Sequence, residues 1–257
     1  MWFVYGSLSL WGNTERKGTM IMNGIKEKVR QKAMEMGAID VGWADLEAAS
    51  VLAPDGFKQA LCIVVPLNRG VISHIQETPT HAYYAHYVSV NRLIDDITLQ
   101  LALLLEAEGY PAQAIPAGPP MLSDDTVLHG LFQHKTTAVL SGMGWIGKSA
   151  LFLHREYGSG VRLGSVLTTT ALPIENKPME SQCGGCRICT RVCPSGAIKG
   201  EKWELGMERE TLFDALKCDT YINTHHEEIA HQMVCGLCMA HCPFTKGTRK
   251  LDESLRN

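Results

Sequence analysis

Apolar residues recur at helical spacing in two long stretches of the chain and form one short unbroken run between them. From Ile25 to Met36 the apolar positions repeat every four residues and stop before a glycine, which predicts a helix. A broader apolar stripe predicts a second helix from Tyr87 to Glu108. The run from Ala60 to Val65 ends at a proline and predicts a buried strand.

The following part of the chain alternates between strand-like and helix-like segments. Strands are predicted from Tyr110 to Ile115, from Ala150 to His154 and from Val161 to Thr170, with a turn at Tyr157 to Gly160 between the last two. A helical stretch is expected within Thr126 to Leu140. Helices and strands mixed in this way indicate an α+β fold that precedes the cysteine-rich region.

Cysteine is distributed unevenly along the chain. Of its nine cysteines, eight fall between Cys183 and Cys242, and thiols only two or three residues apart indicate metal ligands. The ninth, Cys62, lies in the predicted buried strand and is expected to be a core thiol. The formal net charge of −3 offers no strong field for nucleic acid. No apolar run reaches the roughly 18 residues that a membrane helix needs, so no membrane association is expected.

The spacing of these cysteines is that of a bacterial ferredoxin. The first group reads Cys183-x2-Cys186-x2-Cys189-x3-Cys193-Pro194, and the second ends in Cys235-x2-Cys238-x3-Cys242-Pro243. In this arrangement the fourth cysteine of a group ligates the other cluster. Two 4Fe–4S clusters are therefore expected, the first held by Cys183, Cys186, Cys189 and Cys242 and the second by Cys193, Cys218, Cys235 and Cys238. Two structural zinc sites would use the same cysteines and are the alternative.

Two other motifs match known sites in spacing but not in context. Residues 142–149 fit the phosphate-binding pattern of ATPases, yet Ser149 leads into an apolar run and not into a long helix. ATP is therefore not an expected ligand. His226 and His231 are five residues apart, so they do not share a helix face as the histidines of a zinc protease do. Both are expected to be solvated.

Three segments before the cysteines resemble a known family. Gly142-Met-Gly-Trp-Ile-Gly-Lys148, Tyr157-Gly158 and Val161-Arg162-Leu163-Gly164, followed by the cysteine array, resemble the epoxyqueuosine reductases and are similar to the reductive dehalogenases. The resemblance implies a nitroreductase-like corrinoid-binding domain followed by a small two-cluster ferredoxin-like domain. We therefore divide the chain into a poorly packed extension over 1–21, a corrinoid-binding domain over 22–176, a cluster domain over 177–246 and a polar tail over 247–257.

In the family that this chain resembles, electrons pass through two clusters to the cobalt of a corrinoid. The resemblance implies cobalamin or a related corrinoid, bound by Gly142, Gly144, Trp145, Gly147, Lys148, Tyr157, Gly158 and Arg162. It also implies an external electron donor of the ferredoxin or flavodoxin type. The expected function is the reduction of a small organic substrate in the cytoplasm. The alternative is a corrinoid carrier or reductant that serves a corrinoid protein or methyltransferase and has no substrate of its own.

The chain departs from the epoxyqueuosine reductases at the position of their proton donor. Their Asp-x-x-Pro-x-x-Glu-Arg stretch precedes the glycine loop, and counting back without gaps puts Leu128 at the Asp position and His134 at the Glu position. Another group would have to donate the proton, and the candidates are His129, Tyr83, Tyr84, Tyr87, Asp124, Asp125 and His134. Efficient reduction of epoxyqueuosine is therefore not expected. Without a basic stripe, tRNA is not an expected partner either.

Overall fold

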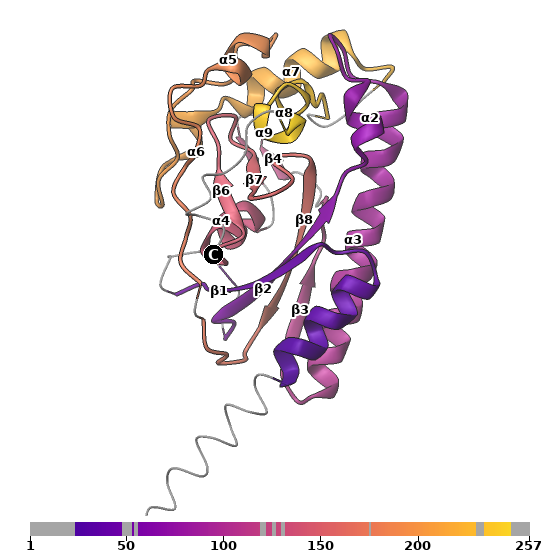
Figure 1. Ribbon diagram of the computed structural model, residues 1–257, viewed down its shortest axis with the longest axis vertical. Coiled ribbons are helices and arrows are strands. Elements are labelled where there is room, and N and C mark those ends of the chain that lie inside the picture. Colours follow the sequence, from indigo (N-terminus) through magenta and orange to yellow (C-terminus); the bar gives the residue numbers. More distant parts are fainter. Residues whose placement is uncertain are drawn as a thin grey trace, which may run out of the picture.

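The computed structural model describes residues 24–47, 53, 56–118, 122–124, 127–129, 132–174, 176–229 and 234–247, with the backbone alone at 122–124 and 127–129. The extension expected over 1–21 and nearly all of the tail expected over 247–257 lie outside these residues. Figure 1 shows a central sheet with helices on both faces and the helices of the cysteine-rich region gathered at one end.

A four-stranded sheet forms the centre of the fold. The strands β1 (Asp40–Asp45), β2 (Gln59–Pro66), β8 (Val161–Thr168) and β3 (Ala112–Ile115) lie in the order β1-β2-β8-β3, and each neighbouring pair is antiparallel. β2, β3 and β8 match predicted strands, whereas β1 was not predicted. β3 pairs only with the second half of β8. Within the described residues the first half of β8 is therefore unpaired on that side, which leaves Arg162 at an open edge.

Both faces of β2 are buried, and alternate residues serve opposite faces. Leu61 and Ile63 belong to the core under α3 (His81–Ala107), whereas Cys62 and Val64 belong to the core on the other face. Cys62 is fully buried, as expected of a core thiol. A strand covered on both faces shows an unbroken apolar run in its sequence and no alternation.

The long helix α3 covers one face of the sheet, with the helix over residues 24–35 beside it (Figure 1). It begins at His81, earlier than the apolar pattern predicted, because the Thr80 hydroxyl accepts a hydrogen bond from the Tyr83 N–H at 3.1 Å and caps the helix. Gly164 of β8 permits the close approach of this helix, since a Cβ at that position would lie 2.4 Å from Ile94 Cγ2.

The opposite face is covered by α4 (His134–Leu140) and by a hairpin of β6 (Gly144–Ile146) and β7 (Phe152–His154). The turn predicted at Tyr157 to Gly160 does not join two paired strands, because β7 pairs with β6 while β8 pairs with β2 and β3. The glycine-rich segment thus contains a strand, β6, that is too short to show a period in the sequence.

The cysteine-rich region supplies a set of mostly short helices at one end of the sheet (Figure 1). These are α5 (Ile188–Val192), α6 (Arg209–Leu212), α7 (Ala215–His225), α8 (Leu237–Ala240) and α9 (Pro243–Lys246). The remaining elements are α2 (Arg69–Ser73) and a hairpin of β4 (Leu122–Asp124) and β5 (Val127–His129). None of the helices in the described part of the chain is long and apolar enough to cross a membrane.

A buried ionic cluster ties the β6–β7 hairpin to the edge of the sheet. Asp40 Oδ2 accepts hydrogen bonds from Arg155 at 2.7 Å and from His154 Nε2 at 3.2 Å. The Glu156 N–H donates to His154 Nδ1, which fixes the tautomer with the proton on Nε2. Burial alone would raise the pKa of Asp40, but His154, Arg155 and the Val41 N–H together lower it below its usual value.

Replacing Asp40 with Ala should therefore lower the free energy of unfolding by roughly 3 kcal/mol, the low end for breaking a buried pair, because part of Arg155 stays in water. Since the folded-state pKa of Asp40 is depressed, its contribution is present above the unfolded pKa of about 4 and is lost as the pH falls below it. Chemical denaturation of both proteins at pH 7 and in acid measures this. The exposed Asp96→Asn variant is the control, and an equal loss in both variants would contradict the assignment.

Candidate functional site

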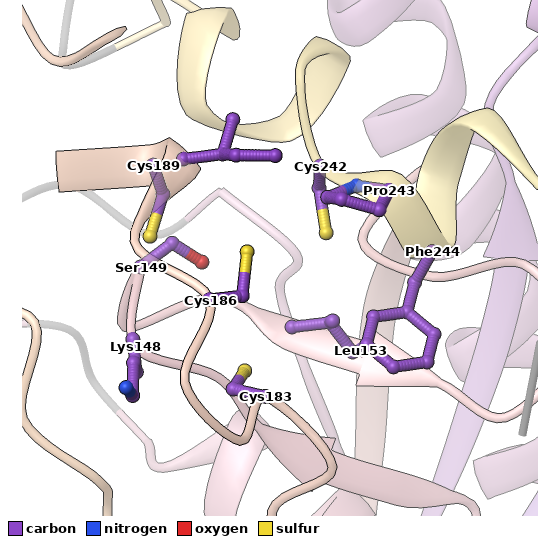
Figure 2. Close-up of a pocket in the computed structure, with 10 residues that line it drawn as sticks. Lys148, Ser149, Leu153, Cys183, Cys186, Cys189, Cys242, Pro243 and Phe244 are labelled. Atoms are coloured by element: carbon purple, nitrogen blue, oxygen red, sulfur yellow. The ribbon is translucent and has the colours of Figure 1, made fainter. Parts of the chain in front are cut away.

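Four cysteines from distant parts of the cysteine-rich region line one cavity (Figure 2). They are Cys183, Cys186, Cys189 and Cys242, the four that the spacing assigns to the first cluster. Their sulfurs point toward a common space, whose walls are completed by side chains that include Leu153 and Phe244. Cys189 lies in α5 and Cys242 caps the start of α9, so the folding of these two helices brings the two ends of the array together.

The other four cysteines form a second group, because they perturb one another's ionisation. Burial, and after it the neighbouring Cys193 and Cys235, raise the pKa of Cys218 to about 12. The pKa of Cys238 is raised by burial and then by Cys235, Cys218 and Cys193. Cys218 lies in the first turns of α7 and Cys238 in α8. The rest of α7, as far as His225, fills the first part of the long sequence gap between Cys218 and Cys235.

Such crowding of buried thiols has a chemical consequence. Burial, and after it the nearby Cys183 and Cys242, also raise the pKa of Cys189 to about 11. Thiolates so close together need nearby positive charge, which metal ligation supplies. Among the described residues, no three His, Cys, Asp or Glu side chains gather in an arrangement that could hold a single metal ion. The sulfurs of the first group instead surround a cavity, as the corners of a cubane require.

The glycine-rich loop contacts the first cysteine group directly. A Cβ at Gly147 would lie 2.6 Å from Leu153 Cδ1 and 3.3 Å from Cys183 Sγ, so glycine lets the loop pack closely against both side chains. The ammonium of Lys148 is nearly buried and donates a hydrogen bond to the Gly184 carbonyl oxygen at 2.7 Å. No described carboxylate forms an ion pair with Lys148. Its positive charge therefore lies beside the thiolate-bearing loop.

The other residues of the expected corrinoid set also have protein neighbours. Gly144 allows the β6–β7 hairpin to close, since a Cβ there would lie 2.0 Å from the Leu153 oxygen, and Gly142 packs against Asn176. Trp145 is buried against Phe244. Gly158 lies against the backbone of Thr245, and the Tyr157 ring meets the His154 ring edge-on at 5.6 Å. Among the residues expected to bind the corrinoid, Arg162 is therefore the one that lies away from the glycine loop and from the residues that pack against that loop.

Arg162 lies with two of the candidate tyrosines beside the second cysteine group. Its guanidinium carbon lies 4.2 Å from the centre of the Tyr87 ring, and its Nε donates to Asn91 Oδ1 at 2.9 Å. Tyr83 is buried, and a Cβ at Gly236, between Cys235 and Cys238, would lie 2.8 Å from its ring. Burial raises the pKa of the Tyr83 hydroxyl. The second cysteine loop thus packs directly onto α3.

His134 joins this region from α4. Its Nδ1 lies 2.8 Å from Ser165 Oγ, while its Nε2 is buried without a hydrogen-bond partner. Burial, and after it the nearby Arg162, lower the pKa of His134 to about 4, so the imidazole is neutral at neutral pH. Of the other candidates, Tyr84 is half-buried in the core, His129 and Asp124 lie in strands described by their backbone alone, and Asp125 lies outside the described residues.

Lys135, next to His134, is a polar residue that the sequence reasoning missed. Its Nζ donates to the Ala150 carbonyl oxygen at 2.8 Å. Burial of the ammonium group, and then the charges of Arg209 and Arg162, lower its pKa to about 8, although part of the side chain is exposed. Counting back from the glycine loop puts His134 at the Glu position of the relatives' Asp-x-x-Pro-x-x-Glu-Arg stretch and Lys135 at its Arg position. This count could have identified Lys135 as a candidate.

One expectation about the histidines is wrong. His226 is buried and not solvated, because it caps the end of α7 and its ring packs edge-on against Tyr221 at 5.6 Å. His231 lies outside the described residues.

The comparisons with known proteins agree with this arrangement. Residues 182–245 match the model of the 4Fe-4S double cluster binding domain, which defines the cysteine-rich region as an iron–sulfur module. An epoxyqueuosine reductase from Gloeobacter violaceus is 37% identical over 203 residues, which are 74% of this chain and 57% of that protein. The chain therefore belongs to the superfamily of the epoxyqueuosine reductases and reductive dehalogenases.

Solved structures show the same fold at lower identity. An epoxyqueuosine reductase with an epoxyqueuosine-modified tRNA-Tyr stem loop superimposes with a TM-score of 0.56 at 19% identity, over 91% of this chain and 69% of that one. A catabolic reductive dehalogenase in complex with 3-bromo-4-hydroxybenzoic acid superimposes with a TM-score of 0.66 at 16% identity, over 89% of this chain and 32% of that one. The chain thus spans little more than half the length of the curated relative described above.

Replacing Cys189 with Ser should remove one cluster and about half of the bound iron, because one corner of the first cubane loses its thiolate. Replacing the core thiol Cys62 with Ser should leave the iron content unchanged. Iron and acid-labile sulfide, measured after anaerobic purification, test both variants together. Two zinc ions per chain with little iron, or equal iron loss in the two variants, would contradict the cluster assignment.

Proposed function

We propose that the protein is a corrinoid-binding redox enzyme that passes electrons through two 4Fe–4S clusters and reduces a small organic substrate. The observation that carries the proposal is the contact between the second cysteine group and the polar residues at the open edge of β8. Tyr83 packs on Gly236 of that group, and its ionisation responds to Arg162, Tyr87 and Cys238 alike. The second cysteine group, as a redox centre, therefore lies beside a polar site that consists of Arg162, Tyr83, Tyr87, His134 and Lys135.

The exposure of the two groups supports a direction of electron flow. Gly184, Gly185 and Arg187, in the first cysteine loop, are exposed, so an external donor can approach the first cluster. Cys238 of the second group is half-buried, and it interacts electrostatically with both Cys189 of the first group and Lys135 of the polar site. We propose that a ferredoxin- or flavodoxin-type donor reduces the first cluster and that the second delivers electrons to the polar site, in the cytoplasm.

The residues around the polar site fit a large, polar cofactor. His134 presents a buried Nε2 without a partner, and Lys135 and Arg162 carry positive charges that pair with no described carboxylate. Amide or phosphate groups of a corrinoid would satisfy such groups. Because Gly147 and Lys148 contact the first cysteine loop, we assign the corrinoid to the side of Arg162. When bound, the corrinoid would supply the cobalt that exchanges electrons with the substrate.

A residue other than the Asp that donates the proton in the epoxyqueuosine reductases would have to deliver the proton here. Leu128, at the Asp position, cannot donate a proton. A group whose pKa is close to the working pH transfers protons best, and the pKa of Lys135, about 8, meets that condition. Tyr83 and Tyr87 are hydroxyl donors in the same polar site, and Arg162 stacked on Tyr87 holds that ring in place.

The second candidate function is that of a corrinoid carrier or reductant without a substrate of its own. The observation that favours it is Leu128, because a protein that only reduces or delivers a corrinoid needs no positioned acid. The two functions share the clusters and the corrinoid site and differ in whether a substrate is turned over.

Corrinoid binding can be tested by anaerobic titration with cobalamin. The visible spectrum should shift toward the base-off form, and Lys135→Met should weaken binding roughly tenfold, because a partly dehydrated charge that meets a polar partner contributes about 1.4 kcal/mol or more. Lys148→Met should leave the affinity near that of the wild type, and Lys28→Met, on an exposed lysine paired with Glu108, is the control. The absence of any spectral change with the wild type would refute corrinoid binding.

Epoxyqueuosine itself should be a poor substrate. A positioned acid typically contributes about a hundredfold to ten-thousandfold to the rate, and Leu128 cannot supply it. The net charge of −3 also gives little attraction for a polyanion. The assay supplies tRNA bearing epoxyqueuosine, cobalamin and a strong reductant, and detects queuosine by mass spectrometry. Turnover as fast as that of an authentic epoxyqueuosine reductase would contradict this expectation, and its loss in Lys135→Met would then identify the replacement donor.

A further inference from the structure

The Ser195 hydroxyl lies beside the sulfur of a cysteine in the second group. Ser195 Oγ is 3.3 Å from Cys193 Sγ, and both residues are half-buried. Cys193 directly follows α5, and Pro194 and Ser195 lead into a turn in which Gly196 has a positive φ of 65°. The Gly196 N–H donates to the Cys193 carbonyl oxygen at 3.2 Å. This short turn therefore brings the hydroxyl and the sulfur together.

A second contact of the same hydroxyl decides which atom donates. The Ala197 N–H donates to Ser195 Oγ at 3.3 Å, so the oxygen acts as an acceptor on that side. A hydroxyl carries a single proton, and among the described residues Cys193 Sγ is the other polar atom in contact with it. A cysteine that ligates a cluster is a thiolate and can only accept. The Ser195 proton is therefore directed at the Cys193 sulfur.

The backbone around Ala197 holds the hydroxyl in this orientation. Ala197 is fully buried, and its carbonyl oxygen accepts a hydrogen bond from the Asp214 N–H at 3.0 Å. Asp214 is the N-cap of α7, the helix that carries Cys218. The turn that contains Ser195 is therefore fixed relative to a helix that contributes another cysteine of the second group.

The sulfur of Cys193 lies with the second cysteine group. Burial raises the pKa values of Cys218, Cys235 and Cys238, and the charge of Cys193 contributes to each of the three increases. A hydrogen bond to a ligand sulfur stabilises the more negative, reduced cluster and so raises its reduction potential. The Ser195 contact therefore acts on the second cluster, although Ser195 follows the first group in the sequence.

We propose that the Ser195 hydroxyl donates a hydrogen bond to the Cys193 thiolate and raises the reduction potential of the second 4Fe–4S cluster. The inference rests on the proposed two-cluster function and extends it, because a higher potential at the second cluster draws electrons from the first. Ser195 acts through Cys193 and is thus a positioning residue and not a catalytic one.

Anaerobic redox titrations of three variants test the proposal. Ser195→Ala removes the hydroxyl and should shift the midpoint potential of one cluster to a more negative value while the iron content stays that of the wild type. Ser195→Thr keeps a hydroxyl and should keep both potentials near those of the wild type. Thr190→Val is the matched control, because Thr190 also follows a cysteine of the array but its hydroxyl donates to the Arg187 carbonyl oxygen at 2.8 Å. This variant should leave both potentials in place.

Resonance Raman spectroscopy gives a second readout that does not depend on the potentials. A hydrogen bond to a ligand sulfur weakens the bond between that sulfur and iron, so one iron–thiolate stretching frequency should rise in Ser195→Ala and stay in place in Ser195→Thr and Thr190→Val. Unchanged potentials or unchanged frequencies in Ser195→Ala, or equal shifts in Ser195→Ala and Ser195→Thr, would overturn the inference. A wild type with too little iron for two clusters would instead overturn the proposed function beneath it.

Discussion

Two sets of four half-buried thiols must be kept close together without bonding to one another, and the remainder of this structure is arranged around that constraint. Burial and mutual repulsion raise the pKa values of several of these thiols, Cys218 to about 12 and Cys189 to about 11. Only positive metal charge and rigid walls make such groups favourable as thiolates. The sheet domain supplies walls for both groups, through the glycine loop at the first and through Tyr83 at the second.

The sheet domain therefore contacts the two cysteine groups in two different ways. At the first group, Gly147 and Lys148 close the wall of a metal centre that lies near the surface. At the second group, α3 and the open edge of β8 connect the cysteines to Arg162, Tyr87 and the neutral His134. A motif that looks like a phosphate-binding loop in the sequence is thus a support for a cluster. The polar residues beside the second group, and not the glycine loop, are where we propose that the chemistry takes place.

The cysteine pattern, which matches a 4Fe-4S double cluster binding domain over residues 182–245, was the most predictable part of the protein. The two-residue gaps between Cys183, Cys186 and Cys189 are local, so the sequence carries them without knowledge of the fold. The apolar run of β2 was equally readable, because burial on both faces leaves a continuous signature. What sequence periodicity could not find depends on contacts between distant segments. β6 is too short to show a period, and β7 pairs with it and not with the next strand along the chain.

The candidate chemistry beyond the clusters was harder to predict for a related reason. The pKa of Lys135 is lowered by burial and then by Arg209 and Arg162, which are remote in sequence, so no local pattern marks it. His226 appeared to be a solvated histidine until α7 placed its ring against Tyr221. Ser195 reads as an ordinary turn residue in the sequence, and only its contact with Cys193 Sγ sets it apart.

The central claim is that electrons reach a bound corrinoid through both clusters in order. Stopped-flow spectroscopy tests it by mixing a stoichiometric reductant with anaerobic protein that already holds cobalamin. The wild type should show bleaching of the cluster absorbance first and a change in the cobalamin spectrum second. In Cys189→Ser, which lacks the first cluster, the cobalamin change should slow strongly although cobalamin remains bound. A cobalamin change that precedes cluster bleaching, or that is as fast in Cys189→Ser as in the wild type, would contradict the account.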